Sequence, residues 1–199
     1  MAEIKLTYFN TKGRAEISRL ILAYAGVRYT DERVNNFPEI KASLPFGQLP
    51  VLTYKGTVIA QSLTMARFLA NEYGLTGSSN LEAAQADEIV DSALDIMNAG
   101  IPLMRCKDEE EKKVLEKEYF AKVMEYFTRM ENILVTRGGQ FFVGNALTWA
   151  DLMIFAYGDL LKDMNAAALN GFPVITDLLR RIAEIPNIKK WLETRPKSS

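Results

Sequence analysis

The sequence contains no histidine and only one cysteine, Cys106. The lack of histidine excludes Ser-His-Asp and Cys-His catalysis, and it excludes metal sites built on imidazole. A single cysteine excludes an internal disulfide and a Cys-x-x-Cys redox pair. Any chemistry must therefore use tyrosine, arginine, lysine, carboxylates, hydroxyls or backbone amides. The low cysteine content is typical of a reducing compartment, which predicts a cytoplasmic protein.

Excess charge and long apolar runs are also missing. The 24 lysine and arginine residues nearly balance the 25 aspartate and glutamate residues, and the net charge is −1. The charge therefore gives no reason to expect binding to nucleic acid or to an anionic membrane. No apolar stretch approaches the length of a membrane span, and the N-terminus lacks the pattern of a signal peptide. Because 48% of the residues are hydrophobic, the chain can form a substantial core.

Strand and helix patterns alternate over roughly the first 75 residues, in the order βαβαββα. An early helical crossover between the first two strands predicts that these strands pair in parallel. The expected elements are a strand at 4–8, a helix at 14–25, a strand at 27–34, a short helix at 37–44, a hairpin at 50–60 and a helix at 62–74.

Strand patterns disappear after the polar stretch "LTGSSN" at 75–80. The sequence therefore predicts an α/β domain at 1–74, a linker at 75–82 and an all-helical domain at 83–199. The helices expected in the second domain are 83–105, 107–135, 147–161, 173–184 and 186–193.

The stretch "KLTYFNTKGRAE" joins the first strand to the first helix and contains Tyr8, Phe9, Gly13 and Arg14. In open α/β folds, ligands bind beyond the carboxyl ends of the strands. A tyrosine hydroxyl there could donate a hydrogen bond to a thiolate, which would lower the pKa of the thiol. The alternative is that Tyr8 and Phe9 are simply an aromatic pair at the edge of the core. Arg14 lies near the positive end of a helix and needs an anionic partner, such as Glu16 or a ligand.

Two further turns carry candidate binding groups. The proline of "QLPV" is either an ordinary trans turn proline, or it makes a cis Leu49–Pro50 bond that presents the Leu49 backbone to a peptide ligand. Gln61 and Ser62 stand at a helix start, where backbone amides bind carboxylates. The alternative for Ser62 is a helix cap without any ligand.

Two sets of acidic residues in the second half have mainly structural interpretations. Asp87, Asp91 and Asp95 are spaced four apart and share one helix face, where either water or a cationic or partner group faces them. Thr148 and Asp151 have the spacing of a capping box, which predicts a structural role for this pair.

Taken together, these stretches resemble the cytosolic glutathione transferases, specifically the sigma class, which includes the haematopoietic-type prostaglandin D synthases. The resemblance covers nearly the whole chain. It implies a thioredoxin-like first domain, a helical second domain, glutathione as co-substrate and a homodimer. The stretches that carry it are "KLTYFNTKGRAEISRLILAY", "FPEIKASLPFGQLPVL", "AQSLTMARFLA", "DEIVDSALDIM", "FFVGNALTWADL" and "IPNIKKWLETRP".

The resemblance also implies roles for residues around the first turn. Tyr8 matches the tyrosine that activates the glutathione sulfur, and Arg14 matches the arginine that supports it electrostatically. Leu49–Pro50 matches a cis-proline turn that pairs with the cysteinyl backbone of glutathione.

The other glutathione contacts implied by the resemblance come from four places. Gln61 and Ser62 match the pair that holds the γ-glutamyl group. Lys41 and Gln48 match positions near the glycyl carboxylate. Asp95 matches an aspartate that reaches across the dimer to the glutathione of the other subunit.

The sequence also departs from the family pattern. Phe37 stands in the glutathione site where a tryptophan is common, and Gln48 replaces a lysine of the vertebrate synthases. Leu94 occupies one position of their metal-binding aspartate cluster, so no metal is predicted. A pocket for the electrophile is expected from Phe9, Thr11, Gly13, Met97, Gly100, Pro102, Met153 and Tyr157.

The expected function is conjugation of the glutathione thiolate to small hydrophobic electrophiles, with organic hydroperoxides and lipid-derived enals among the substrates. Two alternatives remain open. One is a glutathione-dependent prostaglandin D synthase, although "MNAGIPLM" lacks the tryptophan of that pocket. The other is a non-catalytic descendant that serves as a lens crystallin or ligand carrier.

Overall fold

The computed structural model describes residues 3–197, which form two compact units. The first unit combines the chain up to Thr76 with the chain from Ala183 onward, and the second spans Gly77–Ile182. The sequence places residues 83–199 in one domain, whereas the structure groups the last of them with the first unit. The reason is that helix α9 (Pro186–Thr194) packs on helix α1 (Glu16–Tyr24). The expected domain limits at residues 1 and 199 lie outside the described residues.

The first unit is built on a four-stranded sheet in the order β2-β1-β3-β4. Strand β1 (Ile4–Phe9) pairs in parallel with β2 (Thr30–Val34), which confirms the predicted crossover. It pairs antiparallel with β3 (Val51–Tyr54), and β3 forms a hairpin with β4 (Thr57–Ala60). Strand β1 is central, because it pairs with a strand on each side. Its central position explains its apolar residues, of which Leu6 is fully buried.

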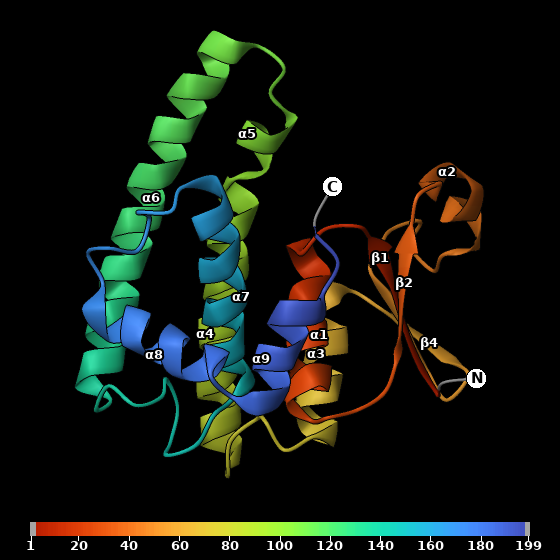
Figure 1. Cartoon of the computed structure of the whole chain (residues 1–199), viewed down its shortest axis with the longest axis horizontal. Coiled ribbons are helices and arrows are strands. Elements are labelled where there is room, and N and C mark those ends of the chain that lie inside the picture. The colour runs from red at the N-terminus through yellow and green to blue at the C-terminus, as the bar shows by residue number, and fades with distance from the viewer. Residues whose placement is uncertain (1–2, 198–199) are drawn as a thin grey trace. The chain divides into compact units, whose positions relative to one another are not determined.

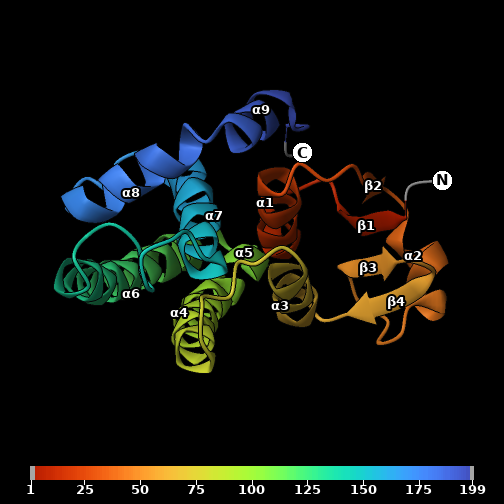
Figure 2. The ribbon, with the colours of Figure 1, turned by 90° about the horizontal axis from the view of Figure 1, so that it is seen from below.

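Helices cover both faces of this sheet. Helices α1 and α3 (Ser62–Glu72) lie against one face, and the short α2 (Phe37–Ile40) lies on the other, as Figures 1 and 2 show. A short 3₁₀ turn, η1 (Gly13–Ala15), precedes α1, and a second, η2 (Lys41–Ser43), follows α2. This is the thioredoxin-like arrangement that the resemblance implies.

The second unit contains helices only, among the residues that the structure describes. They are α4 (Asn80–Ala99), α5 (Ile101–Arg105), α6 (Glu109–Thr136), α7 (Trp149–Met164) and α8 (Pro173–Ala183). Helix α7 is buried over most of its length and lies among its neighbours, as Figure 2 shows. This unit confirms the predicted all-helical second part. Over residues 3–197, no helix combines the length and the apolar character needed to cross a membrane.

The helix expected at 83–105 is interrupted. Helix α4 ends at Ala99, and α5 begins at Ile101. The cause is local, because Pro102 has no backbone N–H and its ring clashes with the carbonyl four residues earlier in a continuous helix. Gly100 at the break packs closely, since a Cβ there would lie 3.0 Å from the ring of Tyr119.

Candidate active site

The candidate site lies at the end of the sheet where β1 stops. The strand register places Thr7 opposite Val51 and Val51 opposite Ala60. Consequently, Tyr8, which follows Thr7, lies at the same end of the sheet as Pro50, which precedes Val51. Gln61, which follows Ala60, lies at that end as well. Three candidate groups from different parts of the sequence therefore converge there.

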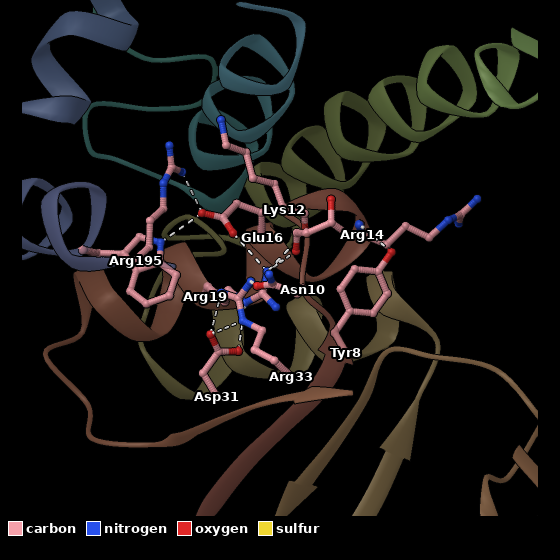
Figure 3. Close-up of polar contacts among 11 residues, drawn as sticks. Tyr8, Asn10, Lys12, Arg14, Glu16, Arg19, Asp31, Arg33 and Arg195 are labelled. Carbon is pink, nitrogen blue, oxygen red and sulfur yellow. Dashed lines mark hydrogen bonds and ion pairs between the residues drawn. The ribbon is translucent and has the colours of Figure 1, made fainter. Parts of the chain in front are cut away.

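Tyr8 is held at the end of the central strand, with 8% of its surface exposed. Its hydroxyl oxygen accepts a hydrogen bond of 3.3 Å from the backbone N–H of Arg14, shown in Figure 3. A tyrosine hydroxyl has one proton and two lone pairs. Accepting from Arg14 uses a lone pair, so the phenolic proton remains for donation to a ligand.

Gly13 allows this close approach of the helix start to Tyr8. Its φ of +41° lies in a region that side-chain-bearing residues rarely adopt. A Cβ on Gly13 would lie 2.8 Å from the hydroxyl oxygen of Tyr8. Only glycine therefore fits here without moving the tyrosine or the backbone.

A buried arginine lies behind the tyrosine. The guanidinium carbon of Arg19 is 5.8 Å from the centre of the Tyr8 ring, within range of a cation–π interaction. Arg19 is fully buried, and it donates to Asp31 and Glu16 at 3.0 and 3.2 Å. Sequence reasoning did not identify Arg19. The sequence signal that could identify it is the spacing of Glu16 and Arg19, two opposite charges three residues apart on an otherwise apolar helix face.

The sequence offers Glu16 as a partner for Arg14, but the contacts of Glu16 are with other residues. One carboxylate oxygen accepts from Arg19, and the other accepts from Trp191 and Arg195 at 2.9 Å each. Glu16 is only 2% exposed. Its role is therefore to pair with the buried Arg19 and with the C-terminal segment.

The second part of the candidate site is the turn before β3 and the start of α3. The Leu49–Pro50 bond is cis, in agreement with the resemblance. Gln61 is exposed and has φ +71°, an unusual value for a residue other than glycine. Ser62 is buried and is the first residue of α3. The start of this helix presents unpaired backbone amides and the positive end of the helix dipole, which suit a carboxylate.

An aromatic series leads from Tyr8 to α2. The ring centres of Tyr8 and Phe9 are 5.3 Å apart, and those of Phe9 and Phe37 are 5.4 Å apart. Further along, a Cβ on Gly47 would lie 3.6 Å from the Lys41 side chain, so Lys41 extends over the turn that leads to Gln48. Gln48 itself is exposed.

Thr11 is half-buried in the loop between β1 and η1. The remaining sequence-predicted pocket residues lie in the second unit. Met97 is half-buried on α4 and Pro102 is exposed on α5. Met153 and Tyr157 of α7 lie inside the core of this unit. The Tyr157 hydroxyl is 2.9 Å from that of Tyr119, and burial raises the pKa of both phenols, so both stay protonated at neutral pH.

The acidic stripe lies on α4 as its spacing predicts. Asp91 and Asp95 are exposed, and Asp87 is half-buried. Over the part of the chain that the structure describes, no group of three or more cysteine, aspartate or glutamate side chains is arranged to hold a metal ion.

Comparisons with known proteins agree with this geometry. The glutathione S-transferase N-terminal domain family matches residues 4–71, and the C-terminal domain family matches residues 94–195. Probable glutathione S-transferase 9 of Caenorhabditis elegans is 36% identical over 205 residues, with 100% of both chains covered. Hematopoietic prostaglandin D synthase of Gallus gallus is 36% identical over 201 residues, again with 100% of both chains covered.

Solved structures give the same assignment. The structure of a Nu-class glutathione S-transferase from Haemonchus contortus is similar with a TM-score of 0.90 and 37% sequence identity. The similarity covers 100% of this chain and 99% of that one. The rat hematopoietic prostaglandin D synthase structure has a TM-score of 0.91 at 32% identity, and 98% of each chain is covered. From its sequence and its fold alike, the chain belongs to the glutathione S-transferase family.

Proposed function

We propose that the chain conjugates glutathione to small hydrophobic electrophiles, with the Tyr8 hydroxyl stabilising the glutathione thiolate. The observation that carries this proposal is the register of the sheet. It brings Tyr8, the turn at Pro50 and the start of α3 to one end of the sheet. A tripeptide with a thiol in its middle and a carboxylate at each end suits that combination of a hydroxyl donor, a peptide-binding turn and a helix start.

The thiolate is the reactive species. A thiol has a pKa of about 8.5, so little of it is ionised at neutral pH. Donation from Tyr8 and the positive charge of Arg14 favour the ionised form and lower that pKa. The thiolate sulfur then attacks an electrophilic carbon and forms a C–S bond. A leaving group departs with the bonding electron pair, or, in an addition, the neighbouring atom takes up the pair and then a proton.

The ends of glutathione are assigned by charge. We propose that Gln61 and Ser62 hold the γ-glutamyl group at the start of α3, and that the Leu49 backbone pairs with the cysteinyl residue. Lys41 supplies a positive charge for the glycyl carboxylate, and Gln48 supplies an uncharged amide beside it.

Phe37 contributes an apolar wall to the glutathione site in this proposal. Its ring contacts Phe9, so it can pack against the peptide, but its side chain has no N–H to donate. For the electrophile, we propose Phe9, Thr11 and Gly13 of the first unit.

Turnover of a generic aryl halide tests the proposal. The unmodified chain is expected to form the aryl thioether of glutathione in proportion to enzyme concentration, with release of one halide ion for each conjugate. Binding of glutathione without any turnover of aryl halides, enals or hydroperoxides would contradict the proposal and favour the carrier alternative.

A second candidate function is glutathione-dependent isomerisation of prostaglandin H to prostaglandin D. It is favoured by a specific observation, the 36% identity over the whole chain to the Gallus gallus synthase. The two functions share the thiolate and differ in the second substrate. Product analysis with the endoperoxide separates them, because isomerisation regenerates glutathione whereas conjugation consumes it.

We also propose that the chain is a sigma-class homodimer in the cytosol. The class assignment is supported by the similarity to the prostaglandin synthases, and the compartment by the single cysteine. In such a dimer, Asp95, which is exposed on α4, would contact the amino group of the glutathione bound by the other subunit.

Replacing Gly13 by alanine is expected to lower glutathione-dependent turnover by roughly tenfold, which corresponds to about 1.4 kcal/mol of barrier. The new Cβ would lie 2.8 Å from the Tyr8 hydroxyl oxygen, so the hydroxyl must move. The matched control is Gly56→Ala in the β3–β4 turn, where φ is also positive but no atom lies within 4 Å of the new Cβ. Steady-state kinetics on both variants check this. Turnover of Gly13→Ala equal to that of Gly56→Ala would contradict a role for the close contact between Gly13 and Tyr8.

A further inference from the structure

A buried cluster of charged residues lies behind the candidate catalytic tyrosine. Its centre is the ion pair of Arg19, which is fully buried, and Glu16, which is 2% exposed. Burying charges is costly unless they are paired and hydrogen-bonded. The contacts of the two side chains therefore indicate which parts of the chain the cluster holds in place.

Arg19 holds the loop between β1 and α1. One of its terminal nitrogens, Nη1, donates to the backbone carbonyl of Thr11 at 2.8 Å. It also donates to the backbone carbonyl of Lys12 at 3.3 Å, as Figure 3 shows. The same nitrogen contacts Glu16. Thr11 and Lys12 lie midway between Tyr8 and Arg14, so the position of this guanidinium sets the path of the loop that joins the two proposed catalytic residues.

Asp31 and Arg33 of β2 extend the same arrangement. Asp31 accepts from the Nε of Arg19 with one oxygen and from Arg33 with the other, at 3.0 and 2.8 Å. Arg33 in turn donates to the side chain of Asn10 at 3.3 Å. The loop is therefore fixed to the cluster at Asn10 as well as at its two carbonyls.

Glu16 connects this loop to the other end of the chain. Its second oxygen accepts from the indole N–H of Trp191 and from the guanidinium of Arg195, each at 2.9 Å. Arg195 follows directly after α9 and is mostly buried. Asn10 makes another link, because its side-chain amide donates to the carbonyl of Lys197 at 3.3 Å. The C-terminal segment thus contacts both the carboxylate that pairs with Arg19 and the loop itself.

We propose that the C-terminal segment Pro186–Lys197 positions the proposed catalytic loop, with Arg195 as a positioning residue that acts through Glu16 and Arg19. Without Arg195, Glu16 loses a charged donor on one oxygen and can turn further toward Arg19. Nη1 of Arg19 then donates more to Glu16 and less to the carbonyls of Thr11 and Lys12, so the loop becomes more mobile. The catalytic consequence of this inference rests on the proposed function, whereas the effect on the loop does not.

Three variants test it. Arg195→Met removes the guanidinium donors and leaves an unbranched apolar side chain. Arg195→Lys keeps the positive charge on a shorter side chain. The control is Arg180→Met on α8, whose guanidinium is exposed and pairs with Asp177 outside the cluster. Amide hydrogen exchange is followed in two peptides, one over residues 9–14 and one over β3, and steady-state kinetics are measured in parallel.

Arg195→Met is expected to speed exchange in residues 9–14 by roughly fivefold or more while β3 exchanges as in the unmodified chain. Its kcat should fall about three- to tenfold, and its KM for the electrophile should change less than twofold. Arg195→Lys should recover part of both effects, and Arg180→Met should show neither. Unchanged exchange in residues 9–14 would overturn the inference, and so would faster exchange across the whole first unit, since that is general destabilisation.

The exchange measurement decides the inference even if the proposed function fails. Absence of glutathione binding and turnover in the unmodified chain would count against the proposed function. Faster exchange confined to residues 9–14 in Arg195→Met would still support the link between the C-terminal segment and the loop.

Discussion

Replacing Asp151 by alanine is expected to destabilise the second unit by roughly 2–6 kcal/mol, since two buried N–H groups would lose their acceptor at about 1–3 kcal/mol each. Asp151 is fully buried at the start of α7. Its carboxylate accepts from the backbone N–H of Phe142 at 2.8 Å, and from the backbone N–H and the hydroxyl of Thr148 at 2.7 and 3.0 Å. A loss of this size is a large fraction of the stability of an ordinary domain.

Urea unfolding measures the loss. The control is Asp163→Ala, an exposed aspartate near the other end of the same helix, where the free energy of unfolding should change by no more than about 0.5 kcal/mol. Equal midpoints for the two variants would show that the capping box does not hold the unit together. Thr148 and Asp151 are predicted from their spacing to form this box, and the structure confirms it.

The contribution of Asp151 should also depend on pH. Burial raises its pKa from 3.8 to about 6, against the effect of the hydrogen bonds that it accepts. The folded state then binds the proton more readily than the unfolded state. The stabilisation that this protonation gives to the folded state is fully present below about pH 4, and it declines as the pH rises through about 6. The difference in unfolding free energy between the unmodified chain and Asp151→Ala should therefore be larger at pH 4.5 than at pH 7.

Replacing Tyr8 by phenylalanine is expected to lower glutathione-dependent turnover by tenfold or more, or at least about 1.4 kcal/mol of barrier. The change removes one hydroxyl and keeps the ring that packs on Phe9. The lost group is the proposed donor to the thiolate. The backbone N–H of Arg14, in the 3₁₀ turn η1, also loses its acceptor.

The matched control is Tyr54→Phe on β3, which removes a hydroxyl bonded to Glu72 and leaves Tyr8 in place. Its turnover should equal that of the unmodified chain. Turnover of Tyr8→Phe at the level of this control would show that Tyr8 is only part of the aromatic packing at the edge of the core.

The sequence predicted the parts of the fold that depend on local pattern. The strand that ends near Tyr8, the parallel crossover to β2 and the hairpin before α3 all follow from apolar spacing and turn residues. The break at Gly100 was missed. The apolar spacing continues across it, and the close contact with Tyr119 that accompanies it is visible only in three dimensions.

The site was only partly predictable, because it depends on contacts between residues that are distant in the sequence. Tyr8, Pro50 and Gln61 could be nominated one by one, but it is the register of the sheet that brings them together. Glu16 and Trp191 are 175 residues apart in the chain. No local pattern links them, so neither their hydrogen bond nor the grouping of residues 183–197 with the first unit could be inferred.

The most direct test of the central claim is the pH titration of glutathione bound to the protein, followed by the ultraviolet absorbance of its thiolate. If Tyr8 stabilises the thiolate, the bound thiol should ionise with an apparent pKa at least one unit below its usual value of about 8.5, and Tyr8→Phe should return it toward that value. A bound thiol that ionises near 8.5 in the unmodified chain, or that is unaffected by loss of the Tyr8 hydroxyl, would contradict the account.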